Sequence, residues 1–102
     1  MSTIVQVIVV VMERREFSEI AEPEKVYAIR FVDDTTPKSI DLLMKSLARQ
    51  LRRYPGFEKM TPIQMCNTLD VRVYRHVGSG FKTWPYFLGY MHRDRERKAW
   101  YW

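Results

Sequence analysis

The stretch Ile4–Met12 reads IVQVIVVVM and contains one polar residue, Gln6. Valine and isoleucine are β-branched, so the stretch favours an extended strand, and it is far shorter than the roughly 20 residues that a membrane-spanning helix needs. A strand with one solvent-exposed face alternates apolar and polar residues, whereas a strand covered on both faces is apolar throughout. The stretch therefore predicts a central strand of a small sheet, with cover on both faces.

The next segments predict a second strand and an amphipathic helix. Lys25–Asp33 (KVYAIRFVD) alternates apolar residues and is expected to pair antiparallel with Ile4–Met12, since consecutive strands are usually neighbours. Thr36 before Pro37 is typical of a helix start, because threonine can accept hydrogen bonds from free amides and proline suits the first helical position. Apolar residues then recur at helical spacing until Pro55-Gly56, which predicts a helix over Pro37–Tyr54.

The rest of the chain predicts one short helix and three further strands. Thr61-Pro62-Ile63-Gln64 combines a capping box with an N-terminal proline and predicts a helix that ends near Leu69. The predicted strands are Asp70–Val77, Trp84–His92 and Ala99–Trp102, the last two joined by the exposed charged turn Arg93–Lys98. Residues 1–102 thus form a single α+β domain of order β-β-α-short α-β-β-β, whose small, mostly antiparallel sheet carries the amphipathic helix on one face.

Charge is distributed unevenly along the chain. Residues 1–36 contain four basic and seven acidic side chains, a net −3, whereas residues 37–102 contain thirteen basic and five acidic, a net +8. An excess of basic side chains over two thirds of a domain favours a polyanionic partner. The same excess also serves solubility alone, and this second interpretation stays open.

Enzyme signatures are weak. The chain contains no phosphate-binding glycine loop and no nucleophile elbow, and Gly78-Ser79-Gly80 has the composition of a turn. Asp33 and Asp34 could hold a divalent cation as in a metal-dependent nuclease, although their place before Thr36 is typical of helix capping. His76 and His92 could act as acid and base if they met in space. We expect a protein without enzymatic activity, bound metal or cofactor, and keep the nuclease as the third interpretation.

The basic and aromatic side chains after residue 44 favour nucleic acid as the partner. Cations neutralise phosphates, and exposed aromatic rings stack on unpaired bases. Arg72, Tyr74 and His76 share one face of a predicted strand. The full set of candidate nucleic-acid-binding residues is Lys45, Arg49, Arg52, Arg53, Arg72, Tyr74, His76, Lys82, Trp84, Arg93, Arg95 and Arg97. We therefore expect a weakly sequence-specific nucleic-acid-binding protein, with DNA and RNA both open as ligands.

Two other interpretations follow from the need to cover the second face of Ile4–Met12. Most of the later aromatic side chains could provide that cover, namely Trp84, Phe87, Tyr90, Trp100 and Trp102. If they do not, a second copy of the chain or a host protein could do so, which would make the protein a homodimeric or host-directed interaction module.

Cysteine usage and composition bear on the setting. Cys66 has no partner for an internal disulfide, and no secretory signal precedes Ile4–Met12, so we expect a cytoplasmic protein without membrane association. The short chain is rich in Met, Arg and aromatic residues and has only four amide side chains. In these traits it resembles the small proteins of crenarchaeal filamentous viruses. That resemblance implies a protein of the host cytoplasm in an infected thermophile, one that handles nucleic acid or acts on a host component.

Overall fold

The computed structural model describes residues 4–14, 25–79 and 82–102, without the side chains of residues 4–5, 78–79 and 82–84. These described residues form β1 (Ile4–Met12), β2 (Val26–Val32), α1 (Pro37–Leu51), α2 (Pro62–Thr68), β3 (Asp70–Ser79), β4 (Lys82–Tyr90), β5 (His92–Asp94) and β6 (Ala99–Tyr101). The α+β class is confirmed, as is the predicted order as far as β3. The predicted strand Trp84–His92 is interrupted at Met91, so that β4 ends at Tyr90 and a further strand, β5, takes in the start of the predicted turn Arg93–Lys98.

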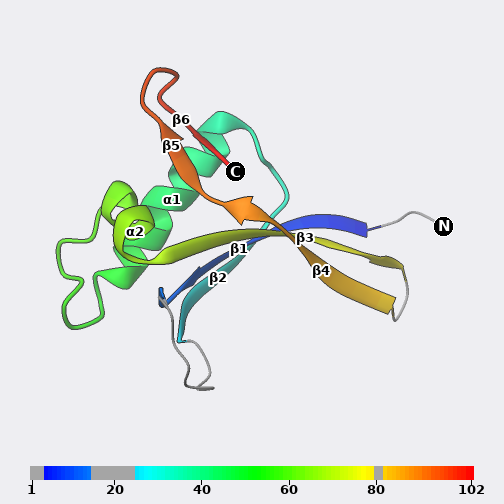
Figure 1. Cartoon of the computed structure of the whole chain (residues 1–102), viewed down its shortest axis with the longest axis horizontal. Coiled ribbons are helices and arrows are strands. Elements are labelled where there is room, and N and C mark those ends of the chain that lie inside the picture. The colour runs from blue at the N-terminus through cyan, green and yellow to red at the C-terminus, as the bar shows by residue number, and fades with distance from the viewer. Residues whose placement is uncertain (1–3, 15–24, 80–81) are drawn as a thin grey trace.

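Strands β1 to β4 form one antiparallel sheet in the order β2-β1-β3-β4. The central position predicted for Ile4–Met12 is therefore confirmed, as is its pairing with the next strand. Strand β4 lies at an edge, where Pro85 can be accommodated although it has no amide to donate. The start of β1, the end of β3 and the start of β4 project together away from both helices (Figure 1).

One face of this sheet packs against α1 and forms the core. Val9 and Val11 of β1 and Val71 and Val73 of β3 are almost completely buried on that face. Helix α1 contributes a buried stripe at helical spacing, made of Ile40, Met44, Leu47, Ala48 and Leu51. Apolar surface removed from water in this way is the main source of the domain's stability.

Helix α1 ends earlier than the sequence predicts. Its last residue is Leu51, and the predicted final turn through Tyr54 is instead a pair of tight turns, with the Tyr54 amide donating to the Leu51 carbonyl at 3.0 Å. Helix α2 begins with the predicted capping box. The Gln64 amide donates to Thr61 Oγ1 at 3.2 Å, and the Thr61 amide donates to Gln64 Oε1 at 3.3 Å.

The last two strands leave the main sheet and form a small hairpin, β5–β6, beside α1. Trp100 is buried there, and its indole Nε1 donates to Asp41 Oδ1 of α1 at 3.0 Å. The hydrogen bonds from Trp100 and Lys45 hold the pKa of Asp41 below its usual value. The Trp100 ring thus adds to the helix-covered side, and the prediction that the C-terminal aromatics cover the second face is wrong for Trp100.

None of the helices in the described residues has both the length and the apolar composition required to cross a membrane.

Candidate nucleic-acid interface

The face of the four-stranded sheet that points away from α1 is left exposed by the described segments. The register places on it Gln6, Ile8, Val10, Ile29, Phe31, Arg72, Tyr74, His76, Phe87 and Tyr90, and we call this surface the open face. Phe31 is 62% exposed, and Ile29, Phe87 and Tyr90 are each between 43% and 50% exposed. The prediction of cover on both faces of β1 is therefore wrong for the described residues, because the helices and the β5–β6 hairpin all pack on the other side.

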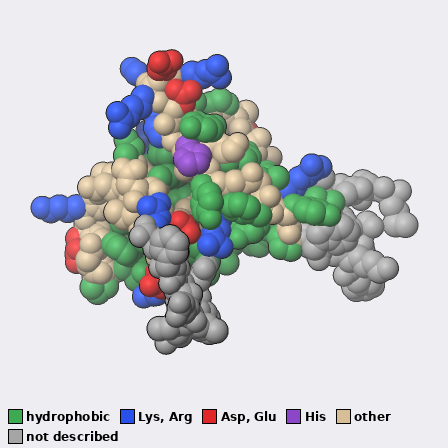
Figure 2. All heavy atoms as spheres, in the orientation of Figure 1, with side chains coloured by type: hydrophobic (Ala, Val, Ile, Leu, Met, Phe, Trp, Pro, Cys, Tyr) green, Lys and Arg blue, Asp and Glu red, His purple; other side chains and the backbone are tan. Residues whose placement is uncertain are grey.

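Three aromatic rings of β3 and β4 gather at the centre of the open face, and we call them the aromatic cluster. The ring centroids of Tyr74 and Phe87 lie 5.6 Å apart, and those of Phe87 and Tyr90 lie 5.2 Å apart in an edge-to-face arrangement. These separations are in the range of favourable aromatic pairs. Figure 2 shows hydrophobic side chains over the middle of the molecule, where β3 and β4 run.

A β-bulge makes this cluster possible. Side chains in a regular strand alternate between faces, so residues 87 and 90 should point in opposite directions. The register of β3 and β4 shifts between Val73, which pairs with Gly89, and Tyr74, which pairs with Phe87. The extra residue in β4 restores Phe87 and Tyr90 to the same face. Gly89 in this bulge has a φ of +154°, a conformation that side-chain-bearing residues rarely adopt.

The polar side chains of β3 on the open face are Arg72, which is positively charged, and His76. Arg72 Nη2 lies 3.3 Å from Asp70 Oδ2, and its side chain is 23% exposed. His76 lies further along β3, opposite Gln6 on one side and Pro85 on the other. The open face therefore combines aromatic and aliphatic surface with little charge.

The four cations predicted on the first helix lie on the other side of the sheet. Lys45 pairs with Asp41 at 2.9 Å, and Arg52 Nε donates to the Met60 carbonyl at 3.0 Å. Arg49 and Arg53 instead line a surface depression together with Arg30 of β2. The two groups of predicted phosphate contacts thus occupy separate surfaces.

The C-terminal cations form a third group on the β5–β6 hairpin. Arg93 lies over the Trp100 ring at 5.0 Å and pairs with Asp41 at 3.5 Å, so it holds the hairpin against α1. Arg97 pairs with Asp94 at 3.8 Å, and Arg95 is exposed in the turn. Basic and acidic side chains are mixed at this tip (Figure 2). The side chains of Lys82 and Trp84, also predicted to bind, lie outside the described set.

Asp34 accepts hydrogen bonds from Thr36 and Ser39 at the start of helix α1. Its Oδ1 accepts from the Thr36 amide at 2.9 Å and its Oδ2 accepts from Ser39 Oγ at 2.8 Å, which lowers the Asp34 pKa. The amide-capping role predicted for the Thr36 side chain is wrong, since Thr36 Oγ1 donates to Ser39 Oγ instead.

Asp33, the other aspartate considered as a metal ligand, accepts a hydrogen bond at Oδ1 from Gln6 Nε2 at 3.4 Å. Among the described residues, no group of three His, Cys, Asp or Glu side chains is close enough to hold a metal ion.

The two histidines do not meet. His76 lies in the main sheet, whereas His92 lies in β5 with its ring 5.4 Å from that of Tyr101.

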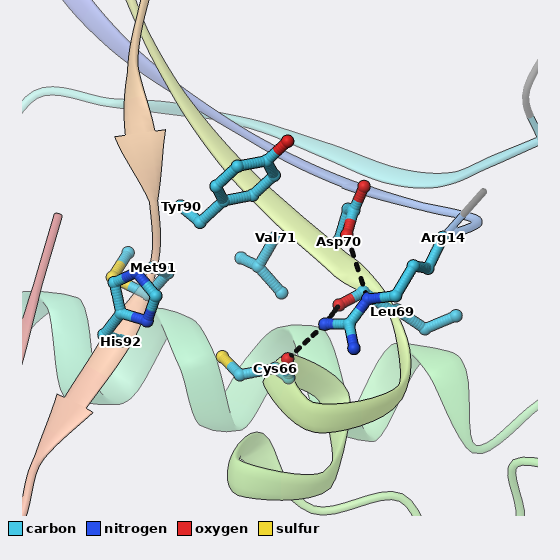
Figure 3. A pocket seen from close by; sticks show the side chains of 8 residues that line it. All are labelled: Arg14, Cys66, Leu69, Asp70, Val71, Tyr90, Met91 and His92. Atoms are coloured by element: carbon cyan, nitrogen blue, oxygen red, sulfur yellow. Dashed lines mark hydrogen bonds and ion pairs between the residues drawn. The ribbon is translucent and has the colours of Figure 1, made fainter. Parts of the chain in front are cut away.

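His92 and Cys66 both line a pocket of about 240 Å³ between α2 and the β4–β5 connection (Figure 3). Burial raises the pKa of the Cys66 thiol to about 11, so the reactive thiolate is scarce at neutral pH.

Arg14 lines the same pocket and has a structural role. Its Nε lies 3.1 Å from Asp70 Oδ1, and its other nitrogens donate to the carbonyls of Cys66, Asn67 and Leu69 at 2.8–2.9 Å (Figure 3). The last carbonyls of a helix have no partner within the helix, and a cation there also interacts favourably with the helix dipole. Arg14, two residues after β1, therefore holds the end of that strand against the C-terminal end of α2.

Arg14→Ala is expected to lower the free energy of unfolding by about 1–3 kcal/mol, because it leaves the carbonyls at the end of α2 without their donor. Chemical denaturation followed by circular dichroism measures this change. Arg95→Ala, at an exposed arginine of the β5–β6 turn, serves as the matched control and should change stability by less than about 0.5 kcal/mol. Equal stability of the two variants would contradict the capping role.

Seven of the ten residues of the open face are absent from the predicted binding set. Four of these seven are large and exposed: Ile29, Phe31, Phe87 and Tyr90. Phe87 and Tyr90 were predicted to cover the second face, whereas they belong to it. The alternation in Lys25–Asp33 predicts that Tyr27, Ile29 and Phe31 share a face. This is wrong for Tyr27: the register shifts there, and Tyr27 packs against the core with its ring 5.2 Å from that of Tyr54. Alternation also does not tell which face the helix will cover. Comparisons of the chain with protein-family models, curated proteins and solved structures find no match.

Proposed function

We propose that this protein binds single-stranded nucleic acid on the open face, with little sequence specificity. The observation that supports this function is the aromatic cluster of Tyr74, Phe87 and Tyr90, in which the Phe87 ring contacts the other two on a sheet face that the described segments leave exposed. Arg72 and His76 stand beside the cluster on β3 and would face the sugar-phosphate backbone. We place this activity in the cytoplasm. If the compositional resemblance to viral proteins reflects descent, this is the cytoplasm of an infected thermophilic host.

Stacking explains why a single strand is the expected ligand. Every base has an aromatic face, so an exposed ring binds bases of any sequence, with about 1–3 kcal/mol for each stacked base. Paired bases in a duplex present their edges instead, and their faces are occupied by neighbouring base pairs. The sheet side chains can reach bases that are already unpaired without first opening a duplex.

Anisotropy titrations with labelled single-stranded and double-stranded DNA and RNA test the proposal. We expect single strands to bind more tightly than duplexes. Because few cations lie on the open face, we also expect a shallow dependence on salt, with a slope of about −0.7 for each neutralised phosphate and few phosphates neutralised. Tighter binding of duplexes, or binding that disappears at moderate salt, would contradict stacking on the open face.

A second candidate function, homodimerisation through the open face, is favoured by one specific observation. Ile29 and Phe31 of β2 are exposed next to Ile8 and Val10 of β1, so apolar surface continues beyond the aromatic cluster to the β2 edge. Contiguous exposed apolar surface of this kind often marks a protein interface. Sedimentation equilibrium separates the two functions: a monomer has a mass of 12.3 kDa, and a dimer twice that value.

A further inference from the structure

A depression of about 260 Å³ lies on the helix-covered side of the molecule, lined by Arg30, Ser46, Arg49, Gln50 and Arg53. Ser46, Arg49, Gln50 and Arg53 occur at intervals of three, four and seven residues, so they share one side of α1 and the turn that follows it. Arg30 reaches the same place from strand β2, because it lies on the sheet face that α1 covers. We call Arg30, Arg49 and Arg53 the arginine triad.

The arginine triad has positive charge in excess. In the described part of the chain, no carboxylate forms an ion pair with any of its three members. Arg49 of α1 and Arg53 of the turn that follows it line the same depression, and like charges brought together in this way repel. Lys25 adds to the field nearby, since its Nζ lies 5.5 Å from the centre of the Tyr54 ring, and Tyr54 adjoins Arg53 and Gln50. An anion in the depression would relieve this repulsion.

The guanidinium of Arg30 is held in position before any ligand arrives. Its Nη2 donates to Gln50 Oε1 and its Nη1 donates to the Ile29 carbonyl at 3.1 Å. The dipole of α1 favours cations near the helix C-terminus and accounts for Arg49 and Arg53 without any ligand. The helix dipole does not account for Arg30, because Arg30 belongs to strand β2. Arg30 is held by Gln50, whose side chain lines the same depression.

We propose that the arginine triad binds a phosphate group, with the Ser46 hydroxyl and the Gln50 amide as further hydrogen-bond donors. Guanidinium groups match the oxygens of phosphate with paired hydrogen bonds. Three cations suit both the charge of about −2 of a free phosphate or phosphomonoester near neutral pH and the single charge of a backbone phosphodiester. The phosphate can belong to a nucleic-acid backbone or to a free phosphate or phosphomonoester, which share this chemistry. The inference does not depend on the proposed function, because the triad and the open face lie on opposite sides of the sheet.

Thermal unfolding in inorganic phosphate, compared with chloride at matched ionic strength, tests the site. A ligand that binds only the folded state raises the melting temperature, and the rise grows with the logarithm of the ligand concentration above the Kd. We expect phosphate to raise the melting temperature of the wild type above its value in chloride. Arg49→Gln with Arg53→Gln should weaken phosphate binding at least tenfold, since each charge-assisted hydrogen bond contributes strongly. Both residues are exposed, so the variant should remain folded.

The matched control is Lys38→Gln with Arg95→Gln, which removes the same two charges from exposed positions elsewhere. This variant should keep the full response to phosphate. Equal responses of the two double variants, or no difference between phosphate and chloride in the wild type, would overturn the inference. Tyr74→Ala with Phe87→Ala should also keep the phosphate response, so that failure of the open face and failure of the triad are distinguished.

Oligonucleotide binding identifies the source of the phosphate. If the triad takes backbone phosphates, Arg49→Gln with Arg53→Gln will weaken binding of a labelled single strand, and inorganic phosphate will compete with that strand. If it takes a free phosphate or phosphomonoester, the same variant will lose the response to inorganic phosphate and keep the affinity for the strand. Either result supports the site, provided that the wild type responds to phosphate.

Discussion

Replacement of both Tyr74 and Phe87 by alanine is expected to remove most of the affinity for single-stranded nucleic acid. Each ring contributes about 1–3 kcal/mol when it stacks on a base, which corresponds to a loss of roughly 5- to 150-fold for each truncation. The two losses need not add, because the ring centroids lie 5.6 Å apart and each ring orients the other. Anisotropy of a labelled single strand measures the change.

Tyr101→Ala is the control for this experiment. Tyr101 is 52% exposed, close to the 50% of Phe87, but it lies on β6 outside the main sheet. Its truncation should leave the affinity for single strands unchanged. If the double variant also binds like the wild type, while circular dichroism shows that it is folded, the open face is not the binding surface. A fall in sedimentation mass in the double variant would instead support dimerisation.

Leu47→Ala is expected to lower the free energy of unfolding by about 2–5 kcal/mol. Leu47 is fully buried between α1 and the sheet, so truncation removes apolar contact and leaves a cavity that the surrounding side chains fill incompletely. That loss is a large part of the roughly 5–15 kcal/mol by which a domain of this size is usually stable. Denaturant titration of the purified variant measures it.

Leu42→Ala gives a matched control on the same helix. Leu42 is 58% exposed, so the same chemical change should alter stability by less than about 0.5 kcal/mol. A large loss for Leu42→Ala would mean that this side of α1 is covered in solution. Similar losses for both variants would contradict the packing of α1 through its Leu47 side.

Much of the fold follows from local patterns in the sequence. The β-branched run Ile4–Met12, the alternation in Asp70–Val77 and the helical spacing from Ile40 onward each specify an element through backbone preference and the period of apolar residues. Paired signals such as Thr61 with Gln64 specify a helix start through hydrogen bonds within four residues. These features are decided by neighbours in sequence, and the structure confirms them.

The candidate sites were harder to predict from the sequence than the fold, because they depend on contacts between residues that are distant along the chain. Arg72, Tyr74 and His76 were predicted together since alternation in one strand places them on one face. The partnership of Arg30 with Arg49 and Arg53 joins a strand to a helix some twenty residues away, and no local pattern signals it. The predicted cations therefore divide among three surfaces that the sequence does not separate.

The sequence by itself determined where most of the strands and helices lie and that the first strand is central. Only the tertiary structure decided which face of the sheet stays open. Both faces of Ile4–Met12 are apolar, so either could receive α1, and the outcome depends on the packing of the whole chain. The bulge in β4 is the clearest case: it brings Phe87 and Tyr90 to one face because β3 and β4 pair out of regular register, and that register is a property of two strands rather than of one.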